Sequence, residues 1–239
     1  MEQKETWKKR TATISVSDIE RAYQSPADFQ RELVNLINTL CHQNNYKKVI
    51  EIGCEMGVTS MLLDDALEKT FLDYNEDILE KVRLTCDHLG KQGHFVSEDM
   101  FSMSLPDQSY DLVFNAGVIE HYTFDERIAL LKSYSRILNN QGMMVLAVPN
   151  HYCIPYRAAY VLRKEWLNSK RWPWPAEYKI YNLEKELAMA SLQLVQRITF
   201  DHHSAYTFLR YSGIRKLVKL TNALFNYEGY LTVLLIRKI

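Results

Sequence analysis

Glycine is scarce in this chain, which has eight glycines in 239 residues, about half of the usual ~7% share. Two of them, Gly53 and Gly57, fall in a single turn, Gly53-Cys54-Glu55-Met56-Gly57. Glycine is needed where the backbone bends sharply or must come close to another group. The general scarcity therefore draws attention to this one turn.

An excess of charge of either sign is also missing. The chain has 29 basic and 29 acidic residues, and its isoelectric point is about 7.0. Domains that bind nucleic acid are usually strongly basic, so the balance argues against that class. Local basic clusters are interpreted as solvated helix faces rather than as binding patches. They comprise Lys164, Lys170 and Arg171, and then Arg210, Arg215, Lys216 and Lys219.

Paired cysteines and long apolar runs are absent as well. The four cysteines are far apart and form no CxxC pair, which excludes a zinc motif or a disulfide framework of the familiar spacings. No run approaches the ~18 apolar residues of a membrane span. The first ten residues are charged and lead into no apolar segment typical of a signal peptide. We therefore expect a cytoplasmic protein.

The glycine turn belongs to a recognisable unit. The apolar run Val49–Ile52 precedes it, a helix is expected over 59–67, and the short strand 70–72 ends at Asp73, twenty residues after Gly53. A buried strand, a glycine turn, a helix and a second strand that ends in a carboxylate form a βαβ nucleotide-binding unit.

The remaining elements continue this alternation of strands and helices. Residues 1–24 are expected to be a flexible lead-in with a short helix at 18–23, and Ser25-Pro26 is expected to open a helix that runs to residue 42. Further helices are expected over 77–88, 125–138, 183–191 and most of 202–226, and strands over 48–52, 93–97, 110–115, 143–148 (after a turn at 139–142), 192–200 and 230–236. This order predicts a doubly wound α/β sheet.

Residues 150–182 differ in character from the rest of the chain. They are rich in tyrosine, tryptophan and proline, and they are too long for a tight connection between two elements. We interpret them as an inserted lid. Its aromatic side chains either line a substrate pocket or serve packing and dimer contacts; they include Tyr152, Tyr156, Trp166, Trp172 and Trp174.

Several segments, in this order, resemble the motifs of class I S-adenosylmethionine-dependent methyltransferases, of the broad group that includes the ubiquinone/menaquinone methyltransferases. They are Val49–Gly57, Leu72–Asn75, Glu98–Met100, Asn115–His121 and Arg136–Leu138 followed by Gly142. The resemblance implies a mostly parallel, Rossmann-like sheet of seven strands in the order 3-2-1-4-5-7-6 with the last strand antiparallel. It also implies S-adenosylmethionine as the cofactor. We expect a single domain 1–239, with a helical cap (1–45), a cofactor-binding core (46–150), the lid (151–182) and the rest of the sheet (183–239).

The resemblance assigns cofactor-binding roles residue by residue. Gly53 lets the backbone approach the cofactor, and Asp73 accepts hydrogen bonds from the ribose hydroxyls. Asp99 is placed at the adenine amino group, and Glu51 either holds the turn or meets the cofactor ammonium through water. The complete predicted set is Glu51, Gly53, Cys54, Gly57, Asp73, Tyr74, Asp99, Met100, Phe101, Asn115 and Ala116; for Cys54, filling a small space is the simpler interpretation.

One position departs from the family pattern, because Glu55 stands where the family usually has glycine. Its carboxylate either bonds the cofactor ammonium, repels the methionine carboxylate or turns to solvent. The same position argues against a nicotinamide enzyme, whose G-x-G-x-x-G motif would need glycine at 53, 55 and 58, where this chain has Gly53, Glu55 and Val58.

The catalytic candidates are histidines at the expected carboxyl edge of the sheet. A methyl sulfonium is already activated, so the protein chiefly positions the acceptor, and a general base is optional. His121 follows the fourth strand and suits either a structural or a catalytic role. His151 follows the fifth strand, and His203, next to His202, follows the sixth. Nothing in the spacing of these residues predicts a metal site.

The acceptor is only loosely constrained by the sequence. Asn115-Ala116-Gly117-Val118 stands where adenine and glutamine-amide methyltransferases carry an Asn/Asp-Pro-Pro-aromatic motif. We expect O-, N- or C-methylation of a small molecule by a monomer or homodimer without a membrane span. The alternatives are a cofactor-binding module or partner subunit without catalysis, and a nucleic-acid methyltransferase.

Overall fold

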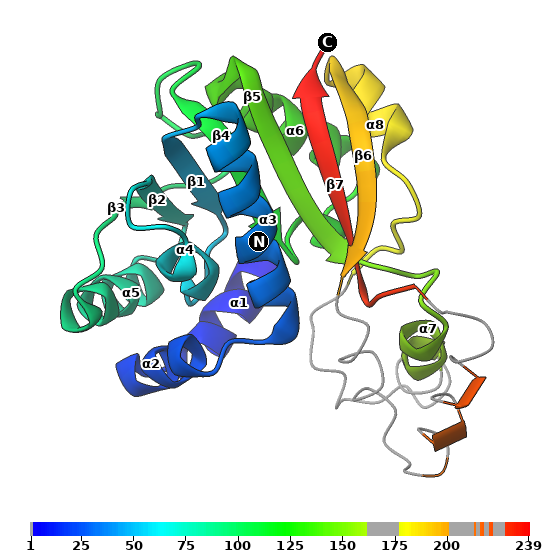
Figure 1. Cartoon of the computed structure of the whole chain (residues 1–239), viewed down its shortest axis with the longest axis horizontal. Helices are drawn as coiled ribbons and strands as arrows, with labels where there is room; N and C mark the ends of the chain where they lie inside the picture. Colours follow the sequence, from blue (N-terminus) through cyan, green and yellow to red (C-terminus); the bar gives the residue numbers. More distant parts are fainter. Residues whose placement is uncertain (1, 162–176, 201–212, 214–215, 218–219, 222–227) are drawn as a thin grey trace.

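The computed structural model describes residues 2–161, 177–200, 213, 216–217, 220–221 and 228–239 (Figure 1). Their strands form one seven-stranded sheet in the order β3-β2-β1-β4-β5-β7-β6. The bounds are β1 Lys48–Ile52, β2 Glu68–Asp73, β3 His94–Ser97, β4 Tyr110–Ala116, β5 Leu138–Pro149, β6 Leu192–Phe200 and β7 Leu231–Lys238. β7 runs antiparallel to β5 and β6, and the other pairs are parallel. The predicted Rossmann-like methyltransferase sheet is confirmed.

Helices cover both faces of this sheet because neighbouring strand residues point to opposite sides. Val49, Phe114 and Val145 pack in the cluster that also contains the apolar face of α3 (Asp28–Asn44). Ile50 and Val113 pack in the cluster on the other side. That cluster includes side chains of α6 (Phe124–Ile137) and α8 (Glu184–Met189). The continuous apolar runs in the sequence thus correspond to strands buried on both faces.

The remaining helices lie beside β2 and β3 or toward the carboxyl ends of the parallel strands. They are α1 (Glu2–Ala12), α2 (Val16–Gln24), α4 (Val58–Leu62), α5 (Glu76–Leu89) and α7 (Ile154–Tyr160), with a 3₁₀ turn, η1, at Ile119–His121. In Figure 1, α7 lies below the ends of β5 and β7, and α1 and α2 lie on the other side. Two groups of helices therefore flank the edge at which ligands bind in such sheets.

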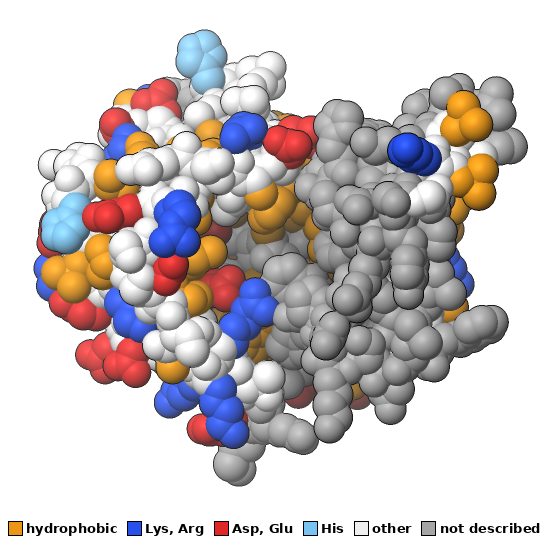
Figure 2. All heavy atoms as spheres, turned by 90° about the horizontal axis from the view of Figure 1, so that it is seen from below, with side chains coloured by type: hydrophobic (Ala, Val, Ile, Leu, Met, Phe, Trp, Pro, Cys, Tyr) orange, Lys and Arg blue, Asp and Glu red, His pale blue; other side chains and the backbone are white. Residues whose placement is uncertain are grey.

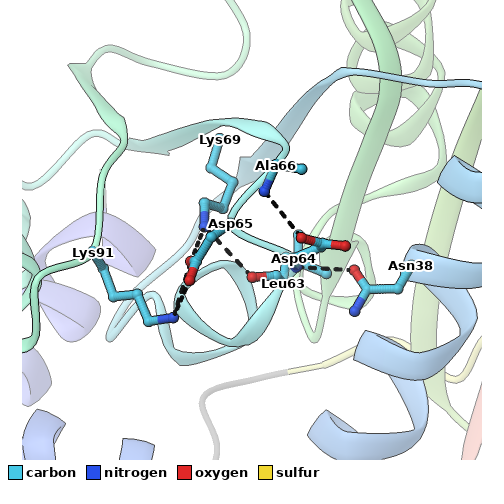
Figure 3. A network of polar contacts seen from close by, with 7 residues as sticks. All are labelled: Asn38, Leu63, Asp64, Asp65, Ala66, Lys69 and Lys91. Atoms are coloured by element: carbon cyan, nitrogen blue, oxygen red, sulfur yellow. Dashed lines mark hydrogen bonds and ion pairs between the residues drawn. The ribbon is translucent and has the colours of Figure 1, made fainter.

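The opposite, amino edge of the sheet is held by a polar network (Figure 3). Lys69, whose side chain is only 2% exposed, donates to Asp65 Oδ1 at 3.1 Å. Lys91 donates to both oxygens of Asp65, at 2.9 and 3.0 Å. The amide of Asp64 donates to Asn38 Oδ1 of α3 at 3.1 Å. These contacts fix the loop that leads from α4 into β2.

Four local predictions are wrong, each for a physical reason. Residues 2–12 form a helix rather than a flexible lead-in, because they pack against the carboxyl edge. Ser25 ends α2, its amide bonded to the Arg21 carbonyl, and α3 is capped at Ala27 instead. The helix expected over 59–67 ends at Leu62, since residues 63–67 enter the polar network.

The fourth correction concerns the turn expected at 139–142. These residues belong to β5, where the pairing with β4 shifts between Tyr110↔Leu138 and Leu112↔Met143. Asn139 donates to Asp111 and accepts from the amide of Gln141, so its side chain sustains the irregular stretch. The helix expected over 202–226 lies largely outside the described residues. Within the described part of the chain, no helix is long and apolar enough to cross a membrane.

Candidate active site

A pocket opens at the carboxyl ends of β1, β2 and β4, with about 580 Å³ of empty space that includes open solvent. Of the residues predicted from the sequence, six line it: Gly53, Asp73, Tyr74, Met100, Ala116 and His121. Seven further lining residues were not predicted as site residues: Trp7, Thr11, Glu55, Asn75, Gly117, Val118 and Tyr122. In Figure 2, which views this edge, acidic and hydrophobic side chains gather in a hollow near the centre of the face.

The glycine turn forms one wall of the pocket and is bonded to the end of β2. The amides of Gly53 and Cys54 donate to the Leu72 carbonyl at 2.8 and 3.1 Å. Gly53 has φ of 72°, and a Cβ added there would lie 3.0 Å from a methyl of Val118. Glycine is therefore required at this position by both conformation and space.

Asp73 ends β2 with its carboxylate on the pocket wall and only 8% of its surface exposed. Its two oxygens accept the backbone amides of Glu55, at 3.1 Å, and Asn75, at 3.0 Å. Burial raises the pKa of Asp73 to about 6, with a smaller contribution from the negative charge of Glu55, although the amide hydrogen bonds oppose the rise.

Glu55, the departure from the family pattern, has a left-handed backbone with φ of 46°. This conformation explains why glycine is usual at this position. The carboxylate lines the pocket and accepts from Nε of Arg10 in α1 at 3.2 Å. The structure thus places the Glu55 side chain against α1.

Glu51 is buried beneath the turn rather than on the pocket wall. It accepts from the amide and the hydroxyl of Ser60 in α4, at 3.2 and 2.6 Å. Burial raises the pKa of Glu51 to about 7, while the bonds from Ser60 oppose the rise. Of its two predicted roles, this geometry favours holding the turn.

Helix α1 covers part of the pocket, a feature that the sequence did not predict. Trp7 and Thr11 line the cavity, and the Asn75 side chain donates to the Thr11 hydroxyl at 2.7 Å. The Tyr74 hydroxyl donates to the Lys4 carbonyl at 2.7 Å, and the Lys4 ammonium pairs with Asp99. The helix is therefore attached to both predicted carboxylate-bearing loops.

Asp99 lies beside this cover and is not on the cavity wall. Burial raises its pKa, but the hydrogen bonds from Lys4 and the Phe101 amide outweigh burial and hold the pKa below its usual value. Met100 lines the cavity, whereas the Phe101 ring packs edge-on against Tyr122, with centroids 5.2 Å apart.

Three other predicted residues are buried behind the wall. Cys54 packs in an apolar cluster, and Gly57 is the N-cap of α4. Asn115 donates to the Tyr134 hydroxyl at 3.3 Å, and its Oδ1 is one of the buried side-chain oxygens without a hydrogen-bond partner in the described part of the chain.

The structure separates the candidate histidines. His121 lines the pocket and lies edge-on to the Trp7 ring, with centroids 5.3 Å apart. His151 does not line it and lies among tyrosine rings, 5.1 Å from Tyr160 and 5.4 Å from Tyr156. His202, His203, Trp166, Trp172 and Trp174 lie outside the described residues. Tyr156 is buried, and Tyr152 is exposed. The described residues contain no cluster of three metal-ligating side chains.

Comparison with known proteins accounts for this geometry. Residues 49–142 match a family model described as a methyltransferase domain. Over these residues the chain is similar to the class I S-adenosylmethionine-dependent methyltransferases. Domains of this class take S-adenosylmethionine as the methyl donor, so the predicted domain type and its cofactor are confirmed at this level.

Individual relatives are similar to this chain either in part of its sequence or in its fold. The human eEF1A lysine and N-terminal methyltransferase is 26% identical over 120 residues, which make up 49% of this chain but only 17% of that protein. A structure of an S-adenosylmethionine-dependent methyltransferase from Clostridium acetobutylicum has a TM-score of 0.62 at 12% identity, covering 90% of this chain and 94% of that one. The magnesium protoporphyrin IX methyltransferase of Synechocystis, with bound SAM, has a TM-score of 0.57 at 15% identity, covering 88% and 80%. These structural likenesses show the fold.

The residues of the methyltransferase domain fit the cofactor of the class. S-adenosylmethionine carries a sulfonium and an ammonium against one carboxylate, and the charged lining residues of the described pocket are Glu55 and Asp73, both acidic. Gly53 leaves the space that a Cβ would take, and Met100 and Ala116 offer an apolar surface. A dinucleotide with its negative pyrophosphate would meet repulsion at the same wall.

Proposed function

We propose that this protein transfers the methyl group of S-adenosylmethionine to a small-molecule acceptor. The observation that carries the proposal is the place of the pocket. It lies between the end of β1, at Gly53, and the end of β4, at Ala116 and Gly117. There the strand order reverses, which is where doubly wound sheets bind ligands.

The roles proposed for the cofactor-binding residues follow from their chemistry. When bound, the cofactor supplies a methyl group activated by a sulfonium. Asp73 accepts from the ribose hydroxyls, Met100 gives the adenine an apolar surface, and Asp99 accepts from the adenine amino group in place of Lys4. Glu51 positions the turn through Ser60 and makes no direct contact.

Among the histidines, His121 is the proposed general base if the acceptor needs one. It is the candidate that reaches the described cavity wall. His151 and His203 stay catalytic predictions, and the tyrosine neighbours of His151 support an acceptor-side position for it.

The methyltransferase subgroup and the class of acceptor are also part of the proposal. The ordered motifs from Val49 to Gly142 support membership of the group that includes the ubiquinone/menaquinone methyltransferases. A small molecule is favoured over a macromolecule because α1 covers part of the pocket and the net charge is zero. Cytoplasmic localisation, a monomer or homodimer, and the division into cap, core, lid and remaining sheet stay predictions.

Calorimetric titration with S-adenosylmethionine and its demethylated product, with NAD as control, tests the cofactor site. We expect binding of both sulfur compounds and none of NAD. Asp73→Ala should weaken binding by about 1–3 kcal/mol, the usual loss when a charged hydrogen bond is removed. Unchanged affinity in this variant would remove the ribose assignment. Cofactor binding without turnover of any acceptor would favour the non-catalytic module instead.

A further inference from the structure

Helix α1 reaches Asp99, the carboxylate assigned to adenine, through the side chain of Lys4. The Lys4 ammonium donates to Asp99 Oδ2 and lies 5.5 Å from the centre of the Tyr74 ring, and Tyr74 lines the pocket. The other oxygen, Asp99 Oδ1, accepts the Phe101 amide at 3.0 Å within its own loop. Lys4 therefore takes the oxygen that the loop leaves available, and it bridges Asp99 and a residue of the cavity wall.

The Lys4 ammonium offers Asp99 the same kind of group as the proposed ligand does. An ammonium and the exocyclic amino group of adenine both present N–H donors to a carboxylate. Because Lys4 contacts both Asp99 and Tyr74, an amino group that approaches Asp99 from the pocket meets the Lys4 side chain. The protein and the cofactor therefore compete for one carboxylate oxygen.

The C-terminal end of α1 is anchored to α5 and its N-cap. The buried Thr11 accepts from Asn75 Nδ2 at 2.7 Å. Lys81 of α5 donates to the carbonyls of Thr11 and Ala12 at 3.4 and 3.5 Å. These contacts leave Asp99 untouched, so this end of the helix keeps its place when Asp99 changes partner.

The first turn of α1 is attached more weakly. Trp7 and Ala12 are the only apolar residues of the helix, so it has no apolar stripe that would bury its first turn. Lys4 contributes the pair with Asp99, in which both side chains are partly exposed, and its carbonyl accepts from the Tyr74 hydroxyl at 2.7 Å. Partly exposed ion pairs add little stability. The first turn can therefore leave its place at a small cost in free energy.

We infer that Lys4 is an intramolecular competitor of the cofactor, which occupies Asp99 in the unliganded protein and yields it when the cofactor binds. This inference rests on the proposed function, because it takes Asp99 as the partner of the adenine amino group. The first turn of α1 detaches on binding, whereas Thr11 stays on the pocket wall. The chain thereby lowers its own affinity for the cofactor.

Hydrogen exchange of the wild-type protein, with and without the demethylated product of the cofactor, tests this movement. The amides of residues 6–8 report on the first turn, because each helical amide bonds to the carbonyl four residues earlier. We expect the ligand to speed exchange at residues 6–8 and to leave residues 11–12 unchanged. A helix that closes over its ligand would exchange more slowly, so slower or unchanged exchange at residues 6–8 would overturn the inference.

Calorimetry with the same ligand tests the competition itself. Lys4→Met should bind the ligand about two- to fivefold more tightly than the wild type, the range that a partly exposed ion pair provides. Lys9→Met, which removes an exposed lysine from the same helix, is the matched control and should leave the affinity unchanged. In an Asp99→Ala background, Lys4→Met should bring no gain, since the contested carboxylate is then missing.

The outcomes separate the inference from the proposed function. Equal or weaker binding by Lys4→Met, an equal gain in Lys9→Met, or a gain that persists without Asp99 would each overturn the competition. The ligand would still bind in those cases, so the cofactor site would stand. Failure of both the wild type and Lys4→Met to bind either sulfur compound would overturn the proposed function itself.

Discussion

Lys69 and Glu120 are both buried ionisable side chains, and they lie toward opposite edges of one sheet. Lys69, near the start of β2, is bonded to Asp65 and to the Leu63 carbonyl, and the same Asp65 also binds Lys91. Glu120, past the end of β4, leaves Oε2 without a partner in the described structure. The two side chains are almost equally buried, so their partners make the difference.

The comparison separates groups that hold the fold from groups that are available to a ligand. At the amino edge each buried charge is matched by the protein, as is usual in structural networks. At the carboxyl edge burial raises the pKa of Glu51, Asp73 and Glu120 alike. Acidic residues with shifted pKa values are common at functional sites, because a ligand or substrate there supplies the partner that the protein itself lacks.

The largest expected effect is a loss of stability at high pH caused by Glu120. Its folded-state pKa of about 8 lies above the ordinary value of 4.5, so the folded protein holds a proton that the unfolded chain has released. Stability therefore falls as the pH rises from about 4.5 to 8. Between pH 6 and 9 the cost should be about 2–3 kcal/mol, at 1.36 kcal/mol per pH unit.

Glu120→Gln should remove most of this pH dependence. Urea unfolding at pH 6 and pH 9 provides the measurement, and Glu51→Gln serves as the control, since the pKa of Glu51 is about 7 and its share is smaller. If the wild-type protein were equally stable at both pH values, Glu120 would have a partner within the protein, and it would not differ from Lys69 in this respect.

At the amino edge, Asp65→Ala should destabilise the protein by about 1–3 kcal/mol, because it leaves buried Lys69 with one acceptor fewer. Glu68→Ala, which removes an exposed pair with Lys48, should cost less than about 1 kcal/mol. Chemical denaturation of both variants gives the comparison. Equal losses would show that burial of Lys69 adds nothing to the value of its ion pair.

Asp73 extends the comparison from protein stability to cofactor binding. With a pKa of about 6, its carboxyl group is protonated at lower pH and then offers fewer acceptor sites to the ribose. Cofactor affinity should therefore fall by about tenfold for each pH unit below about 6. Calorimetry from pH 5 to 8 measures this, and Asp73→Asn should show weak, pH-independent binding. A flat wild-type profile would contradict a role for the ionised form.

Glu55 provides the smallest effect and tests backbone strain rather than charge. Glu55→Gly and Glu55→Ala both lose the bond from Arg10, but only glycine accepts the φ of 46° without strain. The glycine variant should be the more stable of the two by about 1 kcal/mol. Thermal unfolding of the pair decides it, and a more stable alanine variant would show that the turn relaxes.

The sequence predicted the elements whose pattern is local. Apolar runs marked β1 and β4, and Asp73 was recognised by its place after a strand and a glycine turn. Helix α1 was missed because its residues are mostly charged and polar and show no apolar periodicity. Its tertiary contacts to Tyr74, Asn75 and Asp99 stabilise it, and the spacing of residues in the sequence does not reveal these contacts.

The proximity of Glu120 and Glu177 was missed for a related reason. Glu120 belongs to the motif segment Asn115–His121 in the sequence, whereas Glu177 approaches it only through the fold, where the Tyr178 amide donates to the Glu120 carbonyl. Similarly, the stretch at 139–142 resembles a turn in composition, and only the bond between Asn139 and Asp111 shows that it continues β5. Contacts between distant segments decided these cases.

The attachment of α1 has a kinetic consequence. A cofactor that uses Asp99 must first displace the Lys4 ammonium, and the Lys4–Asp99 and Arg10–Glu55 pairs are both partly exposed to solvent. Salt weakens exposed ion pairs. Higher ionic strength should therefore loosen this helix and speed cofactor exchange, the reverse of what salt does to encounters steered by charge. The dissolved ions of the medium would then help to set how long a spent cofactor stays bound.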